Sequence, residues 1–82
     1  TGCYGCDGGW AYKAYTYLEK SGAELESAYP YKGVDGTCQY SSTKAKVNTT
    51  GYKNVSGNNT SMMSAINGQP VAVAINASGY KF

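Results

Sequence analysis

The residues with the clearest chemical potential form the run Gly5-Cys6-Asp7-Gly8-Gly9-Trp10, close to the start of the sequence. Two adjacent glycines let another chain approach the backbone closely, because neither carries a Cβ atom. Their N–H and C=O groups can then pair with an extended peptide, so that the backbone supplies affinity and neighbouring pockets supply specificity. A glycine turn that merely leads into a helix is the plain alternative, since a short motif alone is weak grounds for a function.

The sequence contains three cysteines and no histidine. A cysteine or serine nucleophile needs a base that works near neutral pH, and histidine is the usual one. A structural zinc site takes four ligands, and three dispersed cysteines fit that requirement poorly. The 82 residues taken alone therefore predict no catalytic constellation and no metal site.

The composition narrows the remaining classes of function. The chain has 82 residues, 41% of them hydrophobic, which fits at most one small globular domain. A net charge of +2 spread over scattered lysines gives no patch for nucleic acid. No run of about 18 apolar residues predicts a membrane span. Both ends, at Thr1-Gly2-Cys3 and Tyr80-Lys81-Phe82, have the character of cuts within a longer protein.

A helix is expected directly after the glycine motif. Asp7 can cap a helix that begins near Gly8 or Gly9. Lys20 lies at its expected end, and Gly22 supplies the stop. The apolar residues between these limits fall at helical spacing, at Trp10, Ala11, Ala14, Tyr15 and Leu18.

The remainder of the chain is less regular. Residues 23–44 show no sustained period and carry turn signals, whereas residues 45–55 are compatible with one or two short strands. Residues 58–60 are good helix caps and predict a short helix that stops at Gly68. The alternation from Val71 to Asn76 then predicts a strand.

Five landmarks together resemble the papain family of cysteine proteases, which includes cathepsin L-like enzymes. They occur in the order of that family, at family-like spacing, over essentially the whole chain. Each landmark is moderately specific alone, whereas the combination is very specific. The landmarks are Gly-Cys-Asp-Gly-Gly at 5–9, Tyr29-Pro30-Tyr31, Asp35-Gly36-Thr37-Cys38, Gly51-Tyr52, and Gln69 to Ile75 running into Ala77-Ser78-Gly79.

The resemblance implies an α+β fold with a mostly helical left domain, a β-barrel-like right domain and a substrate cleft between them. Residues 1–45 would belong to the left domain, and residues 46–82 would start the right domain. The implied activity is an endopeptidase that works through a thioester acyl-enzyme and needs no metal or organic cofactor. In such enzymes the nucleophilic cysteine lies upstream of the Gly-Cys-x-Gly-Gly motif, and the histidine lies downstream of Ala-Ser-Gly. This segment is therefore expected to supply cleft walls and to be inactive alone.

Cleft positions carry over from the family one residue at a time. Gly9 matches the glycine whose backbone pairs with the substrate residue two before the scissile bond (P2), and Gly8 precedes it in the same turn. Asp7 matches a cleft-edge position near P1, and Tyr4 matches an aromatic wall of the S3 subsite. Other positions match further walls: Trp10 and Ala11 for S2 and S3, Ala74 for the opposite side of S2, and Ala77 and Ser78 for the start of the primed side. Ordinary packing is the alternative for Tyr4, Trp10 and Ala74.

The cysteines are assigned by the same resemblance. Cys6 matches a structural disulfide position whose partner lies outside these residues. Cys3 departs from the family pattern, because many relatives place the other cysteine of this region several residues further upstream. Cys3 is either that cysteine at a shifted position or an additional one. The disulfide partner of Cys38 is then either Cys3 or a cysteine outside the chain. A Cys3–Cys6 disulfide, which would close a tight loop, is a further alternative. Such bridges imply an oxidising compartment, which means a lysosome, a vacuole or the extracellular space.

The implied partners are peptide and protein substrates, with protein inhibitors or a propeptide in addition, and neither nucleic acid nor a membrane. Two rival functions stay open. One is a catalytically inactive relative that serves binding or structure, which the residue at the nucleophile position would reveal. The other is a small, secreted, disulfide-stapled binding module that only resembles the family, which natural termini and a stable isolated fold would favour.

Overall fold

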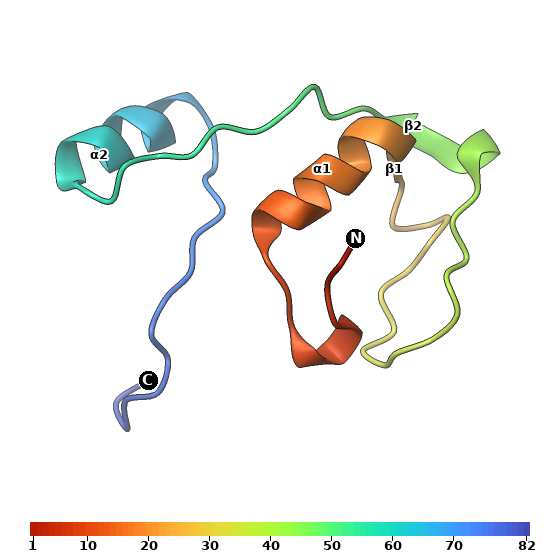
Figure 1. Cartoon of the computed structure of the whole chain (residues 1–82), viewed down its shortest axis with the longest axis horizontal. Coiled ribbons are helices and arrows are strands. Elements are labelled where there is room, and N and C mark those ends of the chain that lie inside the picture. Colours follow the sequence, from red (N-terminus) through yellow and green to blue (C-terminus); the bar gives the residue numbers. More distant parts are fainter.

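The structure, a computed structural model, describes every residue from Thr1 to Phe82. Two helices and a two-stranded sheet give the α+β content that the sequence predicts. The elements are, in chain order, the 3-10 turn η1 (Gly5–Asp7), helix α1 (Ala11–Ser21), strand β1 (Ala23–Glu24), the 3-10 turn η2 (Ser42–Lys44), strand β2 (Ala45–Val47) and helix α2 (Asn59–Gly68). In Figure 1, α1 lies beside the sheet, and α2 lies at the other end of the long axis.

Helix α1 begins at Ala11, which is later than predicted. Asp7 does not cap the helix, because it belongs to η1, and the residue at the N-cap is Trp10 with no side-chain capping bond. Gly8 separates the two elements with a φ of 101°, which breaks the helical path. The predicted stop is confirmed, since Gly22 has a φ of 75° and its N–H donates to the Leu18 carbonyl at 2.8 Å.

The sheet is short and antiparallel, with Ala23 opposite Val47 and Glu24 opposite Ala45. The prediction of a strand within residues 45–55 is confirmed at Ala45–Val47, whereas β1 was not predicted, because two residues are too few to show a period. Gly22 allows the close approach of the two strands. A Cβ atom at that position would lie 3.1 Å from the Val47 carbonyl oxygen.

Helix α2 follows its predicted signals, whereas the strand expected after it does not form. The side chain of Asn58 caps α2 by accepting the Ser61 N–H at 2.8 Å. The prediction of a strand over Val71–Asn76 is wrong, because this segment is irregular and makes no backbone hydrogen bond. A strand needs a neighbour that satisfies its N–H and C=O groups, and no other segment of this chain pairs with it.

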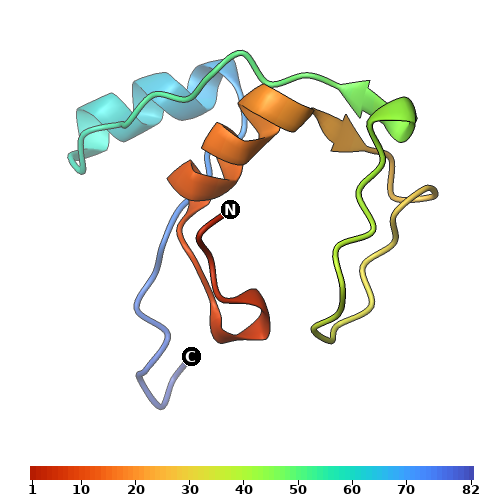
Figure 2. The same ribbon diagram turned by 45° about the vertical axis from the view of Figure 1, so that its right-hand side comes forward.

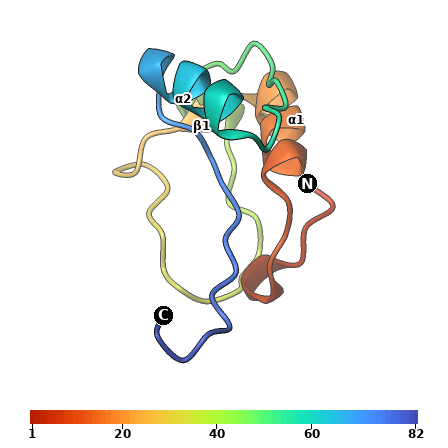
Figure 3. The ribbon, with the colours of Figure 1, turned by 90° about the vertical axis from the view of Figure 1, so that its left-hand side faces the viewer.

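The chain does not close around a hydrophobic core. Gly22 is the single buried residue. The Cα radius of gyration is 15.3 Å, compared with about 12 Å for a compact domain of this length. Figures 2 and 3 show the helices and sheet along one side, with residues 1–10, 25–41 and 69–82 hanging from them as long loops. No helix is both long enough and apolar enough to cross a membrane.

Candidate functional site

A closed turn holds the glycine pair in front of α1. The Tyr4 N–H donates to the Gly8 carbonyl at 2.8 Å, and the Gly8 N–H donates to the Gly5 carbonyl at 3.2 Å. The Asp7 N–H donates back to the Tyr4 carbonyl at 3.0 Å. The φ of 101° at Gly8 is a conformation that a residue with a side chain rarely adopts. The glycine at this position is therefore a requirement of the turn.

Gly9 differs from its neighbours in that its backbone polar groups are unused. Neither its N–H nor its C=O makes a hydrogen bond within the chain, and the residue is exposed. Trp10 continues in an extended conformation, with φ −115° and ψ 135°. Gly9 thus presents one free donor and one free acceptor directly before the extended backbone of Trp10, and free backbone groups of this kind are those to which a peptide strand can be added.

Cys3 occupies the space beside the Gly9 Cα atom. A Cβ atom built on Gly9 would lie 2.5 Å from Cys3 Sγ and 2.6 Å from Cys3 Cβ. The Cys3 N–H donates to Thr1 Oγ1 at 3.1 Å, and its thiol lies 3.9 Å from the Trp10 carbonyl oxygen. The absence of a side chain at Gly9 is therefore required by packing within the chain, whether or not a peptide binds there.

The same surroundings alter the acidity of the Cys3 thiol. The backbone of Trp10 and then the side chain of Thr1 lower the pKa of Cys3, through hydrogen bonding to the sulfur. The positive charge of Lys13 lowers the pKa of Cys3 further, while desolvation opposes these effects. Lys13 is held on this side of α1 by a hydrogen bond to the Gly2 carbonyl at 3.3 Å.

Asp35 joins a distant loop to the first residues of η1. Its Oδ1 accepts the Cys6 N–H at 2.8 Å, across 29 positions of sequence. A Cβ atom on Gly5, whose φ is 58°, would lie 2.9 Å from the Asp35 Cγ atom. The sequence indicated only a turn at this aspartate, because no spacing rule connects it with the glycine motif.

The structure keeps the predicted cleft positions near the glycine turn together and leaves three apart, Ala74, Ala77 and Ser78. Tyr4, Asp7 and residues 8–11 form one continuous stretch, in which the side chains of Tyr4 and Trp10 are 69% and 62% exposed. Neither aromatic ring is therefore packed within the chain. Ala74 lies on the irregular segment 69–82, which runs apart from the first ten residues in Figure 1 and shares no hydrogen bond with them. Near it, Ser78 bonds only to Asn76, with its N–H donating to Oδ1 at 3.0 Å.

All three thiols are free within the chain itself. Cys6 and Cys38 are exposed, and Cys3 is half-buried. The structure thus contains neither a Cys3–Cys6 disulfide nor a Cys3–Cys38 disulfide. The pairing with cysteines elsewhere stays a prediction. No three Cys, Asp or Glu side chains are grouped as a metal ion would require.

The candidate site is thus a glycine turn with unused backbone groups that leads into an exposed helix. The family described as papain family cysteine protease matches residues 1–82. The chain therefore belongs to the papain family of cysteine proteases, as the sequence landmarks predict.

Curated relatives agree with this membership. Cysteine proteinase 5 of Dictyostelium discoideum is 42% identical over 80 residues, which are 95% of this chain and 23% of that protein. Zingipain-1 of Zingiber officinale is 38% identical over 96% of the chain and 37% of its own length. Cathepsin J of Rattus norvegicus is 41% identical over 95% of the chain and 24% of its own length. The chain thus spans less than two fifths of these relatives, and no solved structure matches it significantly.

Proposed function

We propose that this chain is the segment of a papain-family endopeptidase that forms walls of the substrate cleft. The nucleophilic cysteine and the histidine base come from other parts of the enzyme, since the chain has no histidine at all. The reaction forms a thioester with the peptide carbonyl and then hydrolyses it, and it needs no metal or organic cofactor. The contribution of the segment is to hold the substrate in place, which converts binding energy into orientation at the scissile bond.

The observation that carries the proposal is that the N–H and C=O of exposed Gly9, directly before the extended Trp10, are free of hydrogen bonds. An extended substrate pairs with both groups through the backbone of its P2 residue. Asp7 then lies at the cleft edge near P1, and the exposed rings of Tyr4 and Trp10 form walls for S3 and S2. These two rings are large apolar surfaces that a peptide side chain can cover.

The opposite wall of S2 requires a second segment to close on the turn. We place Ala74 there, with residues 1–45 in the helical domain and residues 46–82 at the start of the β-barrel-like domain. We assign the enzyme to an oxidising compartment, lysosomal, vacuolar or extracellular, in which Cys6 and Cys38 form disulfides with cysteines outside this chain. Its partners are peptide and protein substrates, together with protein inhibitors or a propeptide.

A substrate lacking one backbone donor tests the proposal. The intact protease should hydrolyse a fluorogenic dipeptide amide, and a thiol alkylator should abolish the turnover. Methylation of the P2 nitrogen removes the N–H that donates to the Gly9 carbonyl, and it should lower kcat/KM by about tenfold or more. The matched control is the same substrate methylated on its N-terminal blocking group. Equal kcat/KM for both substrates would contradict the pairing of Gly9 with the substrate. An intact protein without any turnover would show that it is an inactive relative.

A further inference from the structure

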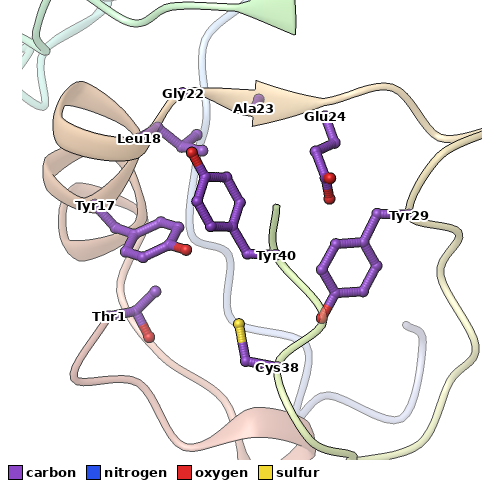
Figure 4. Close-up of a pocket in the computed structure, with 9 residues that line it drawn as sticks. All are labelled: Thr1, Tyr17, Leu18, Gly22, Ala23, Glu24, Tyr29, Cys38 and Tyr40. Carbon is purple, nitrogen blue, oxygen red and sulfur yellow. The ribbon is translucent and has the colours of Figure 1, made fainter. Parts of the chain in front are cut away.

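A pocket of about 430 Å³ lies between the C-terminal end of α1, strand β1 and the loop before η2. Its walls carry three tyrosines, Tyr17, Tyr29 and Tyr40, together with Glu24. Figure 4 shows the Glu24 carboxylate reaching from β1 toward the rings of Tyr29 and Tyr40. The volume is at the small end for ligand sites, so it suits a single side chain or small group.

The Glu24 carboxylate has no partner in the chain. Both of its oxygens are buried, and neither accepts a hydrogen bond. A carboxylate that loses its hydration without gaining a partner is strongly unfavourable. The sheet fixes the backbone from which this side chain extends, because Glu24 pairs with Ala45 across it.

The surrounding tyrosines favour a cation as the missing partner. The Tyr40 hydroxyl already donates to the Ser21 carbonyl, and the Tyr29 hydroxyl accepts the Gln39 N–H at 2.9 Å. The rings of Tyr17 and Tyr40 are arranged edge to face, with centroids 6.2 Å apart. Tyrosine faces attract an ammonium or guanidinium group, and a carboxylate completes its charge balance.

From this arrangement we infer that the pocket receives one lysine or arginine side chain, whose charged end pairs with Glu24. The alkyl stem lies against the tyrosine rings, and the cationic group takes the place of the water that the carboxylate has lost. The cation reaches the carboxylate after a small turn of the Tyr29 or Tyr40 ring, because both oxygens are covered in this chain.

The same polypeptide is the source that the observations favour. A freely exchanging peptide or amine would need the carboxylate to be open to solvent, and it is not. The chain spans 23% and 37% of two relatives, so an enzyme of their length has many residues outside this segment. A side chain from those residues can dock once during folding and stay. The inference does not depend on the role of Gly9, so either can fail alone.

A crystal structure of the intact protease tests the inference directly. The expected result is a lysine or arginine nitrogen from outside residues 1–82, within 4 Å of a Glu24 oxygen, in line with ion-pair geometry. Neutral donors or ordered water as the only partners of Glu24 would overturn it. A cation from a separate molecule would overturn the assignment to the same polypeptide.

Thermal unfolding of two charge-removing variants supplies an independent measurement. Glu24→Gln in the intact protease keeps the shape but leaves the buried cation unpaired, so Tm should fall by roughly 5 °C or more. Glu19→Gln is the matched control, because Glu19 is exposed on α1 and its side chain forms no hydrogen bond. The Tm of this variant should be nearly unchanged. An equal Tm for Glu24→Gln and the wild type would overturn the buried pair.

Discussion

Cys3 and Gly9 are packed against each other so closely that Gly9 cannot gain a side chain unless Cys3 moves. The sulfur of Cys3 lies 2.5 Å from where a Cβ atom of Gly9 would stand. The same glycine keeps its N–H and C=O free of hydrogen bonds. One face of Gly9 is thus covered by the chain itself, while its backbone groups remain available to a peptide.

Substitution of this glycine should impair the intact enzyme with every substrate. We expect Gly9→Val to lower kcat/KM by on the order of a hundredfold, because a displacement of about 1 Å at a positioning contact has an effect of this size. The loss should not depend on the P2 side chain. Ala11→Val should instead change the ranking of P2 residues, since it alters a wall and spares the backbone contact. Near-normal kcat/KM in a well-folded Gly9→Val variant would contradict the substrate-binding role of Gly9, which would then serve only as the entry to helix α1.

A second substitution distinguishes the clash with Cys3 from an effect on the peptide. Gly9→Ala alone should displace the turn, because the new methyl group meets the Cys3 side chain. Adding Cys3→Gly frees that space and should restore most of the lost kcat/KM, with Cys3→Gly alone as the control. Failure of the double variant to recover would show that the substrate itself needs the space beside Gly9.

The hydrogen bond from the Cys6 N–H to Asp35 should support the turn from outside the cleft. Asp35→Ala removes the acceptor, and kcat/KM should fall by up to about tenfold, the effect of one exposed hydrogen bond. Asp35→Asn keeps an oxygen in the same place and should retain most of the activity. If Asp35→Asn and Asp35→Ala behave alike, the hydrogen bond does not position the turn.

The 82-residue chain alone should not cleave peptides. It has no histidine to act as a base, and removal of part of a catalytic unit abolishes most of its rate enhancement. The assay is a fluorogenic dipeptide amide with purified chain. Turnover that a thiol alkylator abolishes would contradict the prediction.

Cys6 should be oxidised in the native protease, although it is free and exposed in this chain. We expect a disulfide to a cysteine outside residues 1–82, because an exposed thiol in an oxidising compartment finds a partner. Peptide mapping without reduction identifies the bridge, and it also reveals the partner of Cys38. A free Cys6 thiol in the native enzyme would argue against this bridge.

The thiol of Cys3 should react at lower pH than an ordinary cysteine when the protein is reduced. Hydrogen bonds from the Trp10 backbone and Thr1 lower its pKa, and Lys13 contributes to the same effect. Since the thiolate is the nucleophile, the midpoint of alkylation against pH should lie below that measured in urea. Lys13→Gln removes one positive charge and should move the midpoint upward. Identical midpoints in native buffer and in urea would contradict the lowered pKa of Cys3 in the folded protein.

Features that depend on near neighbours were well predicted from the sequence. The stop at Gly22 and the Asn58 cap of α2 involve hydrogen bonds within one turn of each helix, so the local residues are sufficient. The start of α1 was misplaced because a φ of 101° at Gly8 separates Asp7 from the helix. The alternation at Val71–Asn76 describes a strand that needs a neighbour, and the chain itself contains none.

By itself, the sequence determined the family, the C-terminal stop of α1, both limits of α2 and the glycine turn, because each depends on residue types at fixed short spacing. The tertiary structure alone decided that Asp35 holds Cys6 and that the Glu24 carboxylate lies unpaired among tyrosines. It also decided that Cys3 covers Gly9. These contacts join groups through the path of the backbone in space, where turns such as Gly8 set the direction. No periodicity or motif records that path, since distance along the chain does not determine distance between side chains.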